Sequence, residues 1–521
     1  MRIVKRMISM ILAATLVIGL SACSNSSKSN SNSGTKGDAN STADSGTNTA
    51  APADKTYDKI VYAYLSFNNI PEDVSEVEAA INQITREKIG VEVTLKPYSI
   101  ADYTQQINLA LQSGEQIDVF HSLGDFNQSV TSQQAYDITD IIDSSAAETK
   151  ALVGDAWLEA TSREGRIYGI PAYKPIALTP MLIYRQDIAD KLGIDMTKVK
   201  SINDVTDVFR KVKEGKPDMT PFAPVSPGTT GVLYTLPEVD NLTDSYVSPK
   251  GVLMHGNTNV IDLYASDEFA NVCNIVRTWY NEGLIMQDAA TTTSAAADLM
   301  SSGNYFSYMA AYSYPPEDTA TSLEGQTGGN DLGAVQLGDA YLDTTTVNAI
   351  TWMVSSTCKK PEAALKFLNL TYTDPDVVNL IIYGIEGKDY VKNADGSVKY
   401  PDGMDAATVP YTAQLSCGIV GNFFIQYPFI ASNPESLKWE ENQNKNAKMS
   451  VAMGFTFDNS NVKTEYTAVE SVISQYLPAL QCGSVDPAVE LPNFIEALKS
   501  AGMNSIIAEK QKQLDAWLAT K

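Results

Sequence analysis

The sequence has few of the residues and motifs on which common enzyme classes depend. Its 521 residues include two histidines, His121 and His255, and five cysteines, which are far apart and form no Cys-x-x-Cys pair. Metal sites in proteins usually need clustered Cys or His side chains, so we expect neither a metal nor a cofactor. No Gly-x-Ser-x-Gly motif, phosphate-binding loop, His-Glu-x-x-His motif or dinucleotide fingerprint is present. These absences argue against hydrolases, metalloproteases and nucleotide-dependent enzymes of the common types.

Positive charge and long apolar runs are also scarce. The 38 Lys and Arg residues are outnumbered by 62 Asp and Glu residues, which gives a net charge of −24. So acidic a protein should not bind nucleic acid or anionic lipid headgroups by charge. After Leu20, no segment is long and apolar enough to cross a membrane. A hydrophobic content of 44% and a charged content of 19% are typical of a globular protein.

Four of the cysteines, Cys273, Cys358, Cys417 and Cys482, lie in the body of the chain. Outside the cell they could form two disulfides, for which three connectivities exist. They could equally remain buried free thiols that act as small hydrophobic side chains. The sequence leaves both alternatives open.

The first 22 residues have the features of a secretory signal peptide. A basic start precedes the apolar segment Met7–Leu20, which is too short to span a bilayer. It ends in Leu20-Ser-Ala-Cys23, which resembles the lipobox of bacterial lipoproteins, in which the Cys receives a diacylglycerol and becomes the new N-terminus. We therefore predict a lipidated Cys23 and a location on the extracytoplasmic face of the cell membrane. The alternative is an ordinary cleaved signal with a chance Cys.

The segment that follows, Ser24–Thr56, consists almost wholly of Ser, Asn, Thr, Gly and Ala with a few charges. It has no large apolar residue and cannot bury enough surface to offset the entropy of ordering. Such a composition behaves as a flexible coil. We predict that residues 23–56 are a disordered tether, which holds a folded body that begins near Tyr57 away from the membrane.

The first part of the body alternates predicted strands with predicted helices. Strand-like runs are followed by amphipathic helical patterns, in the order Lys59–Leu65, Asp73–Ile89, Val91–Leu95, Tyr103–Gln112 and Ile117–Phe120. A strand–helix–strand series of this kind implies a mostly parallel sheet.

Polar and aromatic residues follow two of these predicted strands. Phe67 and Asn68 come directly after the first strand, and Asp125 follows the third. Ligands of such sheets bind at the carboxyl ends of the strands, so these residues are candidates for a ligand cleft. Ordinary loop polarity or local helix capping is the alternative for each of them.

Aromatic residues recur near the ends of predicted strands and loops along the whole body. An aromatic ring can pack on the C–H face of a pyranose, while Asp, Asn and Glu bind its hydroxyls. The set therefore predicts a sugar ligand, although a core position is the alternative for each single ring. Trp352, in a strand predicted at 347–355, is the residue for which we hypothesise stacking on a sugar ring. The set is Phe67, Tyr173, Tyr312, Tyr314, Trp352, Tyr383, Phe423, Phe424 and Tyr427.

Four segments resemble, in this order, those of extracellular solute-binding proteins of family 1, the ligand-capturing lipoproteins of ABC importers. Arg163-Glu-Gly-Arg-Ile-Tyr-Gly-Ile-Pro171 is similar to the family's Gly-Lys-Ile-Tyr-Gly-Val-Pro segment, where the chain first crosses between lobes. Tyr184–Asp187 resembles the strand-to-helix step that follows. Trp279–Ile285 resembles the helix end before the second-lobe strand, and Lys360–Leu368 the helix after the return crossing.

Two further stretches, Tyr383–Tyr390 and Leu491–Trp517, resemble a Firmicutes lipoprotein subgroup that is usually associated with sugar permeases. The resemblance implies an oligosaccharide or glycoside as the ligand and ABC permease subunits as partners. It places the family's stacking aromatic near Tyr312 or Tyr314, and we add Glu386 to the candidate ligand-binding residues.

The resemblance implies an α/β fold of two lobes, the type II periplasmic-binding-protein fold, with a mixed sheet flanked by helices in each lobe and the ligand cleft at the hinge. We predict lobe 1 at 57–173 and 347–430, and lobe 2 at 174–346 and 431–521. The lobes of a monomer would close on the ligand by hinge motion and deliver it to the permease. No catalytic residue is predicted.

Three other functions stay open at this point. A secreted glycoside hydrolase would need two carboxylates about 5–10 Å apart in the cleft. A binding protein that reports its ligand to a sensor kinase would need no permease. A peptide-binding protein would need a charged anchor for the peptide termini, and the sequence offers no clear candidate for one.

Overall fold

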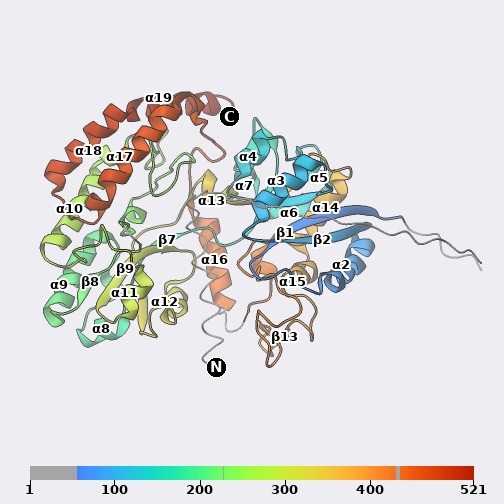
Figure 1. Ribbon diagram of the computed structural model, residues 1–521, viewed down its shortest axis with the longest axis horizontal. Helices are drawn as coiled ribbons and strands as arrows, with labels where there is room; N and C mark the ends of the chain where they lie inside the picture. The colour runs from blue at the N-terminus through green and yellow to red at the C-terminus, as the bar shows by residue number, and fades with distance from the viewer. Residues whose placement is uncertain (1–55, 227, 430–433) are drawn as a thin grey trace, which may run out of the picture.

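The computed structural model describes residues 56–226, 228–429 and 434–521, which form two lobes that lie side by side (Figure 1). The predicted signal peptide, Cys23 and the tether up to residue 55 lie outside the described residues. The predicted lobe limit at 430–431 also falls on residues that are not described.

The lobe on the right of Figure 1 is built on a sheet with the strand order β2 (Val91–Ser99), β1 (Asp58–Ser66), β3 (Val119–Leu123), β12 (Ile350–Val354) and β6 (Ile170–Pro171). Strand β1 runs parallel to β2 and β3, whereas β12 is antiparallel to β3 and β6. The second half of β1 is buried without alternation, as expected of a central strand that is covered on both faces.

Amphipathic helices pack on this sheet. In α2 (Val74–Lys88), the side chains of Val77, Ile81 and Thr85 are buried at intervals of four residues, so one stripe of the helix faces β2. Helix α14 (Pro361–Thr373) begins with a proline, whose missing N–H breaks no bond at that position. The other helices of this lobe are α3 (Tyr103–Ser113), α4 (Phe126–Thr131), α5 (Ile142–Ser145), α6 (Ala147–Val153), α7 (Asp155–Glu159) and α15 (Pro375–Tyr383).

The lobe on the left of Figure 1 has a sheet with the order β10 (Leu332–Gln336), β7 (Thr179–Arg185), β9 (Tyr305–Tyr312) and β8 (Thr220–Phe222). Strand β7 is antiparallel to both neighbours, and β8 runs parallel to β9. The helices of this lobe are α8 (Gln186–Lys191), α9 (Val205–Gly215), α10 (Asp267–Asn281), α11 (Ala296–Ser301), α12 (Pro316–Glu324), α17 (Lys463–Gln481), α18 (Pro487–Ala501) and α19 (Met503–Leu518).

Each lobe has its own hydrophobic core. The core of lobe 1 draws on residues 60–177 and 340–420 together with Met453, and that of lobe 2 on residues 182–337 and 462–506. Within the described residues, the chain therefore passes between the cores three times. The third connection contains α16 (Pro434–Asn446), which lies between the lobes in Figure 1. The lobe limits read from the sequence remain a proposal.

Short strand pairs complete the structure. The parallel pair β11 (Tyr341–Leu342) and β15 (Lys448–Met449) ties the start of the second lobe 1 segment to the third connection. Two antiparallel pairs lie within lobe 1, namely β4 (Ser162–Arg163) with β5 (Arg166–Ile167) and β13 (Val391–Lys392) with β14 (Val398–Lys399).

The strand predicted at 347–355 begins later than expected. Residues Thr344–Asn348 form helix α13, and β12 starts only at Ile350. The carboxylate of Asp343 accepts the backbone N–H of Thr346 at 2.8 Å and its hydroxyl at 2.7 Å. This N-cap stabilises a helical turn before the strand.

The four cysteines within the described residues are free thiols, so the disulfide alternative is not realised there. Burial raises the pKa of the Cys273, Cys358 and Cys482 thiols to about 12, which leaves them neutral and hydrophobic in character. Among the described helices, none combines the length and the apolar character that a membrane crossing needs.

A buried ionic cluster ties the last helix to the rest of lobe 2. The ammonium group of Lys510 on α19 is fully buried and donates to the carboxylate of Asp244 at 2.7 Å, to the carbonyl of Gly251 at 2.9 Å and to that of Asn241 at 3.2 Å. The hydroxyl of Tyr466 on α17 donates to the same carboxylate. Burial lowers the pKa of Lys510 although the carboxylate of Asp244 opposes that effect.

Replacement of Lys510 should therefore destabilise the protein strongly. Lys510→Met leaves the carboxylate of Asp244 buried without its cation, and we expect the free energy of unfolding to fall by about 3–5 kcal/mol in a denaturant titration. Lys512→Met, on the same helix, removes an exposed ammonium that lies 3.1 Å from Glu509 and should cost at most about 1 kcal/mol. Equal decreases in the free energy of unfolding for the two variants would show that the buried cluster stabilises the protein no more than an exposed ion pair does.

Candidate functional site

Side chains near the two ends of helix α16 form hydrogen bonds with other segments. The side chain of Asn444, which is 2% exposed, accepts the backbone N–H groups of Ile176 and Ala177 at 3.1 Å each. Its amide group donates to the carbonyl of Lys174 at 2.7 Å. At the other end of the helix, the hydroxyl of Ser436 donates to the carboxylate of Asp318 on α12 of lobe 2. The helix is thus fixed both to residues 174–177, where the chain leaves lobe 1, and to lobe 2.

We use the name lobe junction for the segments that meet around α16, which are residues 173–178, 312–318, 414–427 and 434–446. Backbone hydrogen bonds bring two of these segments together. The N–H of Tyr173 donates to the carbonyl of Gly421 at 2.8 Å, and the N–H of Phe423 donates to the carbonyl of Tyr173 at 2.9 Å. Residues far apart in the sequence therefore share one small region.

Aromatic rings gather at the lobe junction. The ring of Tyr173 packs edge-on against that of Phe424, with centroids 5.4 Å apart, and Phe424 packs edge-on against Phe423 at the same separation. The hydroxyl of Tyr173 donates to the carboxylate of Glu441 on α16 at 3.3 Å. Burial and this neighbouring carboxylate raise the pKa of Tyr173 to about 12.

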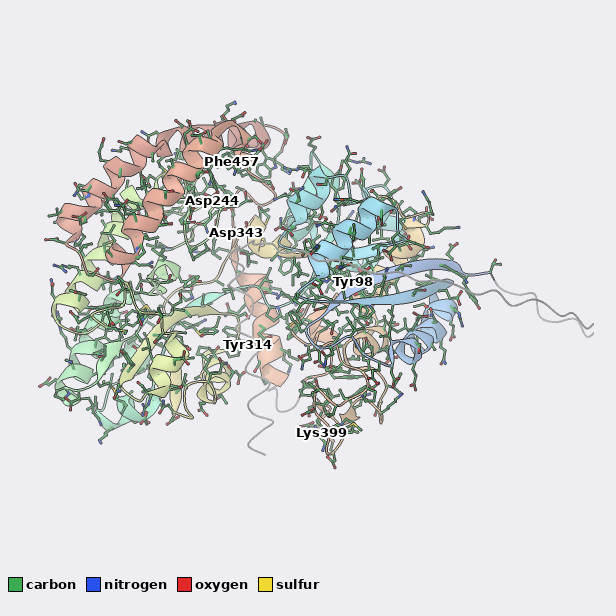
Figure 2. All side chains as sticks on the ribbon, viewed as in Figure 1. Tyr98, Asp244, Tyr314, Asp343, Lys399 and Phe457 are labelled. Atoms are coloured by element: carbon green, nitrogen blue, oxygen red, sulfur yellow. The ribbon has the colours of Figure 1, made fainter. Side chains whose placement is uncertain are left out.

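Tyr314 approaches α16 from lobe 2. Figure 2 shows it beside the helix, two residues beyond the end of β9. Burial raises the pKa of its hydroxyl, and the nearby Glu440 and Cys417 add to that rise. The phenol of Tyr314 is therefore neutral and faces a carboxyl group across the lobe junction.

Glu440 was not among the site residues predicted from the sequence. Its side chain is 1% exposed, and the Oε2 atom has no hydrogen-bond partner among the described residues. Burial and the carboxylate of Asp318 raise the pKa of Glu440 to about 8. At neutral pH the group is therefore mostly a carboxylic acid, which can donate one hydrogen bond and accept others.

Lys174 adds a positive group to the same region. Its ammonium makes no ion pair with any described residue, and burial lowers its pKa. Gly418, which has φ +85°, lies directly against this side chain. A Cβ added at Gly418 would be 2.8 Å from the Cβ of Lys174. The side chain of Lys174 is thus held against the 414–427 segment.

The carboxyl edge of the lobe 1 sheet carries the predicted Asp125. It borders a hollow of about 30 Å³ whose walls include His121 and Ser122 at the end of β3. The Nε2 atom of His121 and the hydroxyl of Ser122 are buried without hydrogen-bond partners in the described part of the chain. Burial raises the pKa of Asp125 and lowers that of His121 to about 3, so the imidazole is neutral.

The structure brings some predicted site residues together and separates others. Tyr173, Tyr314 and Phe423 meet at the lobe junction, as described above. Tyr312 lies at the edge of the lobe junction, as the last residue of β9, and its hydroxyl lies 3.1 Å from that of Tyr308.

Tyr383 and Glu386 lie outside the segments of the lobe junction, although Tyr383 is bonded to one of them. The hydroxyl of buried Tyr383 donates to the carbonyl of Tyr427 at 2.7 Å. The exposed carboxylate of Glu386 pairs with Lys392 at 3.1 Å. Both residues stabilise the extension of lobe 1 that carries β13 and β14.

The 406–413 segment engages the loop after β1. The N–H of Phe67 donates to the carbonyl of Ala413 at 3.0 Å, and the amide of Asn68 donates to the carbonyl of Ala406 at 2.5 Å. The side chain of Asn68 is therefore occupied by a structural bond.

The position of Trp352 corrects our hypothesis that its ring stacks on a sugar. The side chain is 0% exposed, and its indole N–H donates to the carbonyl of Ile419 at 2.7 Å. Its faces are covered by other side chains, for example by Tyr62, whose ring is stacked on it at a centroid distance of 4.7 Å. Trp352 is a core residue of lobe 1 and leaves the candidate ligand-binding set.

Comparison with known sequences identifies two matching families. A profile described as bacterial extracellular solute-binding protein matches residues 79–383, and one described as domain of unknown function (DUF3502) matches residues 451–519. The chain is also similar to a carbohydrate ABC transporter substrate-binding protein of Streptococcus pneumoniae serotype 4 (strain ATCC BAA-334 / TIGR4). The two are 26% identical over 512 residues, which cover 97% of this chain and 96% of the relative.

Solved structures with the same fold include the N-glycan transport solute binding protein NgtS from Streptococcus pneumoniae, with a TM-score of 0.72, 23% identity, and coverage of 89% of this chain and 99% of that chain. An HMO binding ABC-transporter associated solute binding protein from Bifidobacterium longum infantis has a TM-score of 0.61 and 16% identity, and covers 88% and 99% of the two chains. These similarities confirm the predicted two-lobe α/β fold.

The titration of Glu440 should make stability depend on pH. The folded protein keeps a proton that the unfolded chain, with an ordinary glutamate pKa, has already lost, so the free energy of unfolding falls as the pH rises toward about 8. Glu440→Gln lacks this titration. We expect its melting temperature, relative to that of the wild type, to increase by several degrees between about pH 5 and about pH 9.

The matched control is Glu441→Gln, one residue further along α16, whose carboxylate pairs with Lys445 at 2.7 Å. Its melting temperature should show no comparable pH-dependent gain. A difference in melting temperature between Glu440→Gln and the wild type that does not change with pH would contradict the assignment of a buried carboxylic acid.

Proposed function

Since the chain belongs to the family of bacterial extracellular solute-binding proteins, we propose that it is the substrate-binding lipoprotein of an ABC importer and that its cargo is a carbohydrate, an oligosaccharide or a glycoside. Proteins of this family bind solutes outside the cytoplasm and are not enzymes. The observation that carries the proposal is the combination at the lobe junction of aromatic rings, Tyr173, Tyr314 and Phe423, with the unpartnered carboxyl oxygen of Glu440.

This combination suits a neutral ligand that is rich in hydroxyl groups. Aromatic rings provide flat apolar surface for the C–H face of a sugar ring. A protonated Glu440 can both donate to and accept from sugar hydroxyls, and Lys174 offers further N–H donors. Buried groups of this kind discriminate strongly, because a ligand that does not reach them leaves them unsatisfied.

The relatives also support a carbohydrate as the cargo. The relative from Streptococcus pneumoniae is named as a carbohydrate transporter component, and NgtS has been crystallised with Man1GlcNAc and with Man5GlcNAc. For this chain we propose that the lobes close around the sugar at the lobe junction, with movement in the three connections between the cores. The closed form would then present the cargo to the permease subunits.

A screen for thermal stabilisation tests the ligand class. The purified mature chain is heated with Man1GlcNAc, Man5GlcNAc, kestose and smaller sugars, with short peptides as controls. We expect a saccharide at about 100 times its dissociation constant to add about 2.7 kcal/mol to the free energy of unfolding and so to raise the melting temperature.

The fate of the bound saccharide separates the alternatives. Its recovery intact agrees with a transport receptor. Cleaved saccharide would replace the proposal by a glycoside hydrolase, and stabilisation by peptides alone would overturn the carbohydrate assignment while keeping the family.

The lipid anchor is the second part of the proposal. The lipobox-like sequence that ends at Cys23 supports lipidation, which would hold the body near the permease through the 24–56 segment. In cells labelled with palmitate, we expect wild-type protein to carry the label and Cys23→Ser to lack it. Cys417→Ser, which removes a free thiol of the body, should keep the label. Label retained by Cys23→Ser would contradict the anchor.

A further inference from the structure

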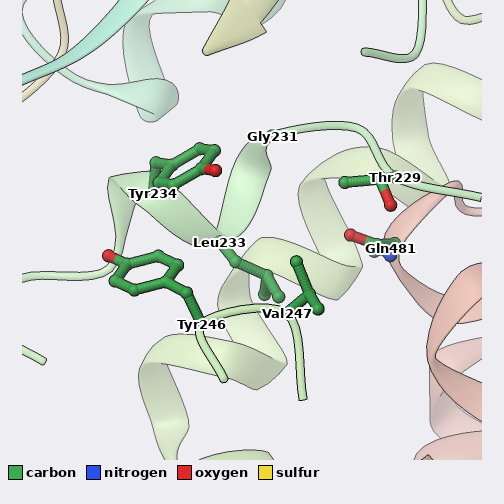
Figure 3. A pocket seen from close by; sticks show the side chains of 7 residues that line it. All are labelled: Thr229, Gly231, Leu233, Tyr234, Tyr246, Val247 and Gln481. Atoms are coloured by element: carbon green, nitrogen blue, oxygen red, sulfur yellow. The ribbon is translucent and has the colours of Figure 1, made fainter. Parts of the chain in front are cut away.

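A small hollow opens on lobe 2 beside the strand that leads to the lobe junction. It has a volume of about 20 Å³, enough for a group of about the size of one water molecule. Figure 3 shows the side chains around it, which come from the loop before and within the turn Val232–Thr235, from the loop near residue 246 and from the end of α17. They are Thr229, Gly231, Leu233, Tyr234, Tyr246, Val247 and Gln481.

Two tyrosines form one side of this hollow. The rings of Tyr234 and Tyr246 are stacked with centroids 5.1 Å apart and an angle of 21° between their planes. Tyr246 is 38% exposed and the adjacent Val247 is 49% exposed. Neither phenol hydroxyl has a hydrogen-bond partner within the part of the chain that the structure describes. The exposed ring of Tyr246 offers a flat apolar surface beside free hydroxyls, which suits the C–H face of a sugar ring.

The opposite side of the hollow holds a fixed hydrogen-bond acceptor. Gln481 is 5% exposed, and its amide nitrogen donates to the carbonyl of Gly228 at 2.5 Å. A carbonyl accepts only from a donor, so this bond fixes the orientation of the amide and assigns the other atom as the oxygen. That oxygen is buried without a partner in the described residues, and Figure 3 shows it directed into the space between Leu233 and Thr229.

The backbone holds these groups against β9. Gly231 has φ +76°, and a Cβ at this position would lie 2.2 Å from the carbonyl oxygen of Met309 on β9. The turn that carries Tyr234 is therefore seated directly on the strand. Tyr234 is close enough to Tyr312 for the charge of one to affect the pKa of the other. The hollow thus lies beside β9, which ends at Tyr312, two residues before Tyr314.

We propose that Tyr234, Tyr246 and Gln481 form a second sugar-binding position on lobe 2, for an outer unit of an oligosaccharide whose inner unit lies at the lobe junction. The exposed ring of Tyr246 packs on the C–H face of the outer unit. One hydroxyl of that unit enters the hollow and donates to the oxygen of Gln481. This inference rests on the proposed function and adds to it that the natural cargo has several sugar units.

The experiment compares a short and a long saccharide. Calorimetric titrations of the mature chain use Man1GlcNAc and Man5GlcNAc as probes. We expect Tyr246→Ala to bind Man5GlcNAc about tenfold more weakly than the wild type and to bind Man1GlcNAc with unchanged affinity. Tyr246→Phe keeps the ring and should keep most of the affinity for both.

Controls separate binding from folding. Because Tyr246 is partly exposed and its main ring contact is with Tyr234, Tyr246→Ala should melt within a few degrees of the wild type and stay folded during the titration. Tyr280→Ala, on α10, removes a half-buried ring elsewhere on lobe 2 and should leave both affinities unchanged.

Three results would overturn the inference, and they are distinguishable from failure of the proposed function. Wild-type affinity of Tyr246→Ala for Man5GlcNAc would remove the second position and leave the carbohydrate assignment intact. Equal losses for both glycans would place Tyr246 in the primary site. Absence of binding of both glycans to the wild type would end the inference, while the other saccharides of the thermal screen would still decide the proposed function.

Discussion

The hydrogen bonds of Asn444 fix how the two lobes meet. The buried side chain of Asn444 satisfies two backbone N–H groups and one carbonyl of residues 174–177, at the end of the first lobe 1 segment. An unsatisfied buried polar group costs about 1–3 kcal/mol, so separating residues 174–177 from α16 would be unfavourable. The positions of Tyr173, Glu440 and Glu441 all follow from this attachment, because they lie on the two segments that Asn444 joins.

Much of the fold was predictable because local patterns and tertiary packing agree. The strand–helix series of lobe 1 and the helices at the C-terminal end have the apolar periodicity that the structure buries. The family prediction is confirmed by the solute-binding protein profile that matches residues 79–383. The error at 347–355 arose where a side-chain cap at Asp343 outweighs the strand propensity of the residues after it.

Less of the candidate site could be predicted from the sequence. Tyr314 and Phe423 could be named because aromatic residues near strand ends are visible in a sequence, but the same rule selected Trp352, which fills the core beside Tyr62. Only the pairing of β12 with β3 decides which way that ring points. Glu440 gave no signal, because its neighbours Asp318 and Tyr314 lie more than a hundred residues away in the sequence. The stacked pair Tyr234 and Tyr246 was missed for the same reason.

The strand order of lobe 1 also has a consequence for the way this protein is made. Strand β12 lies between β3 and β6, so Val354 must reach Val119 before the sheet can close. Contacts between residues so distant in sequence form slowly, since a long loop has to be ordered first. The sheet of lobe 1 therefore cannot be completed until residue 354 has been synthesised. For a protein that leaves the cytoplasm, late completion of this sheet favours passage of the unfolded chain through a narrow export channel. Folding is then postponed to the compartment in which the protein works.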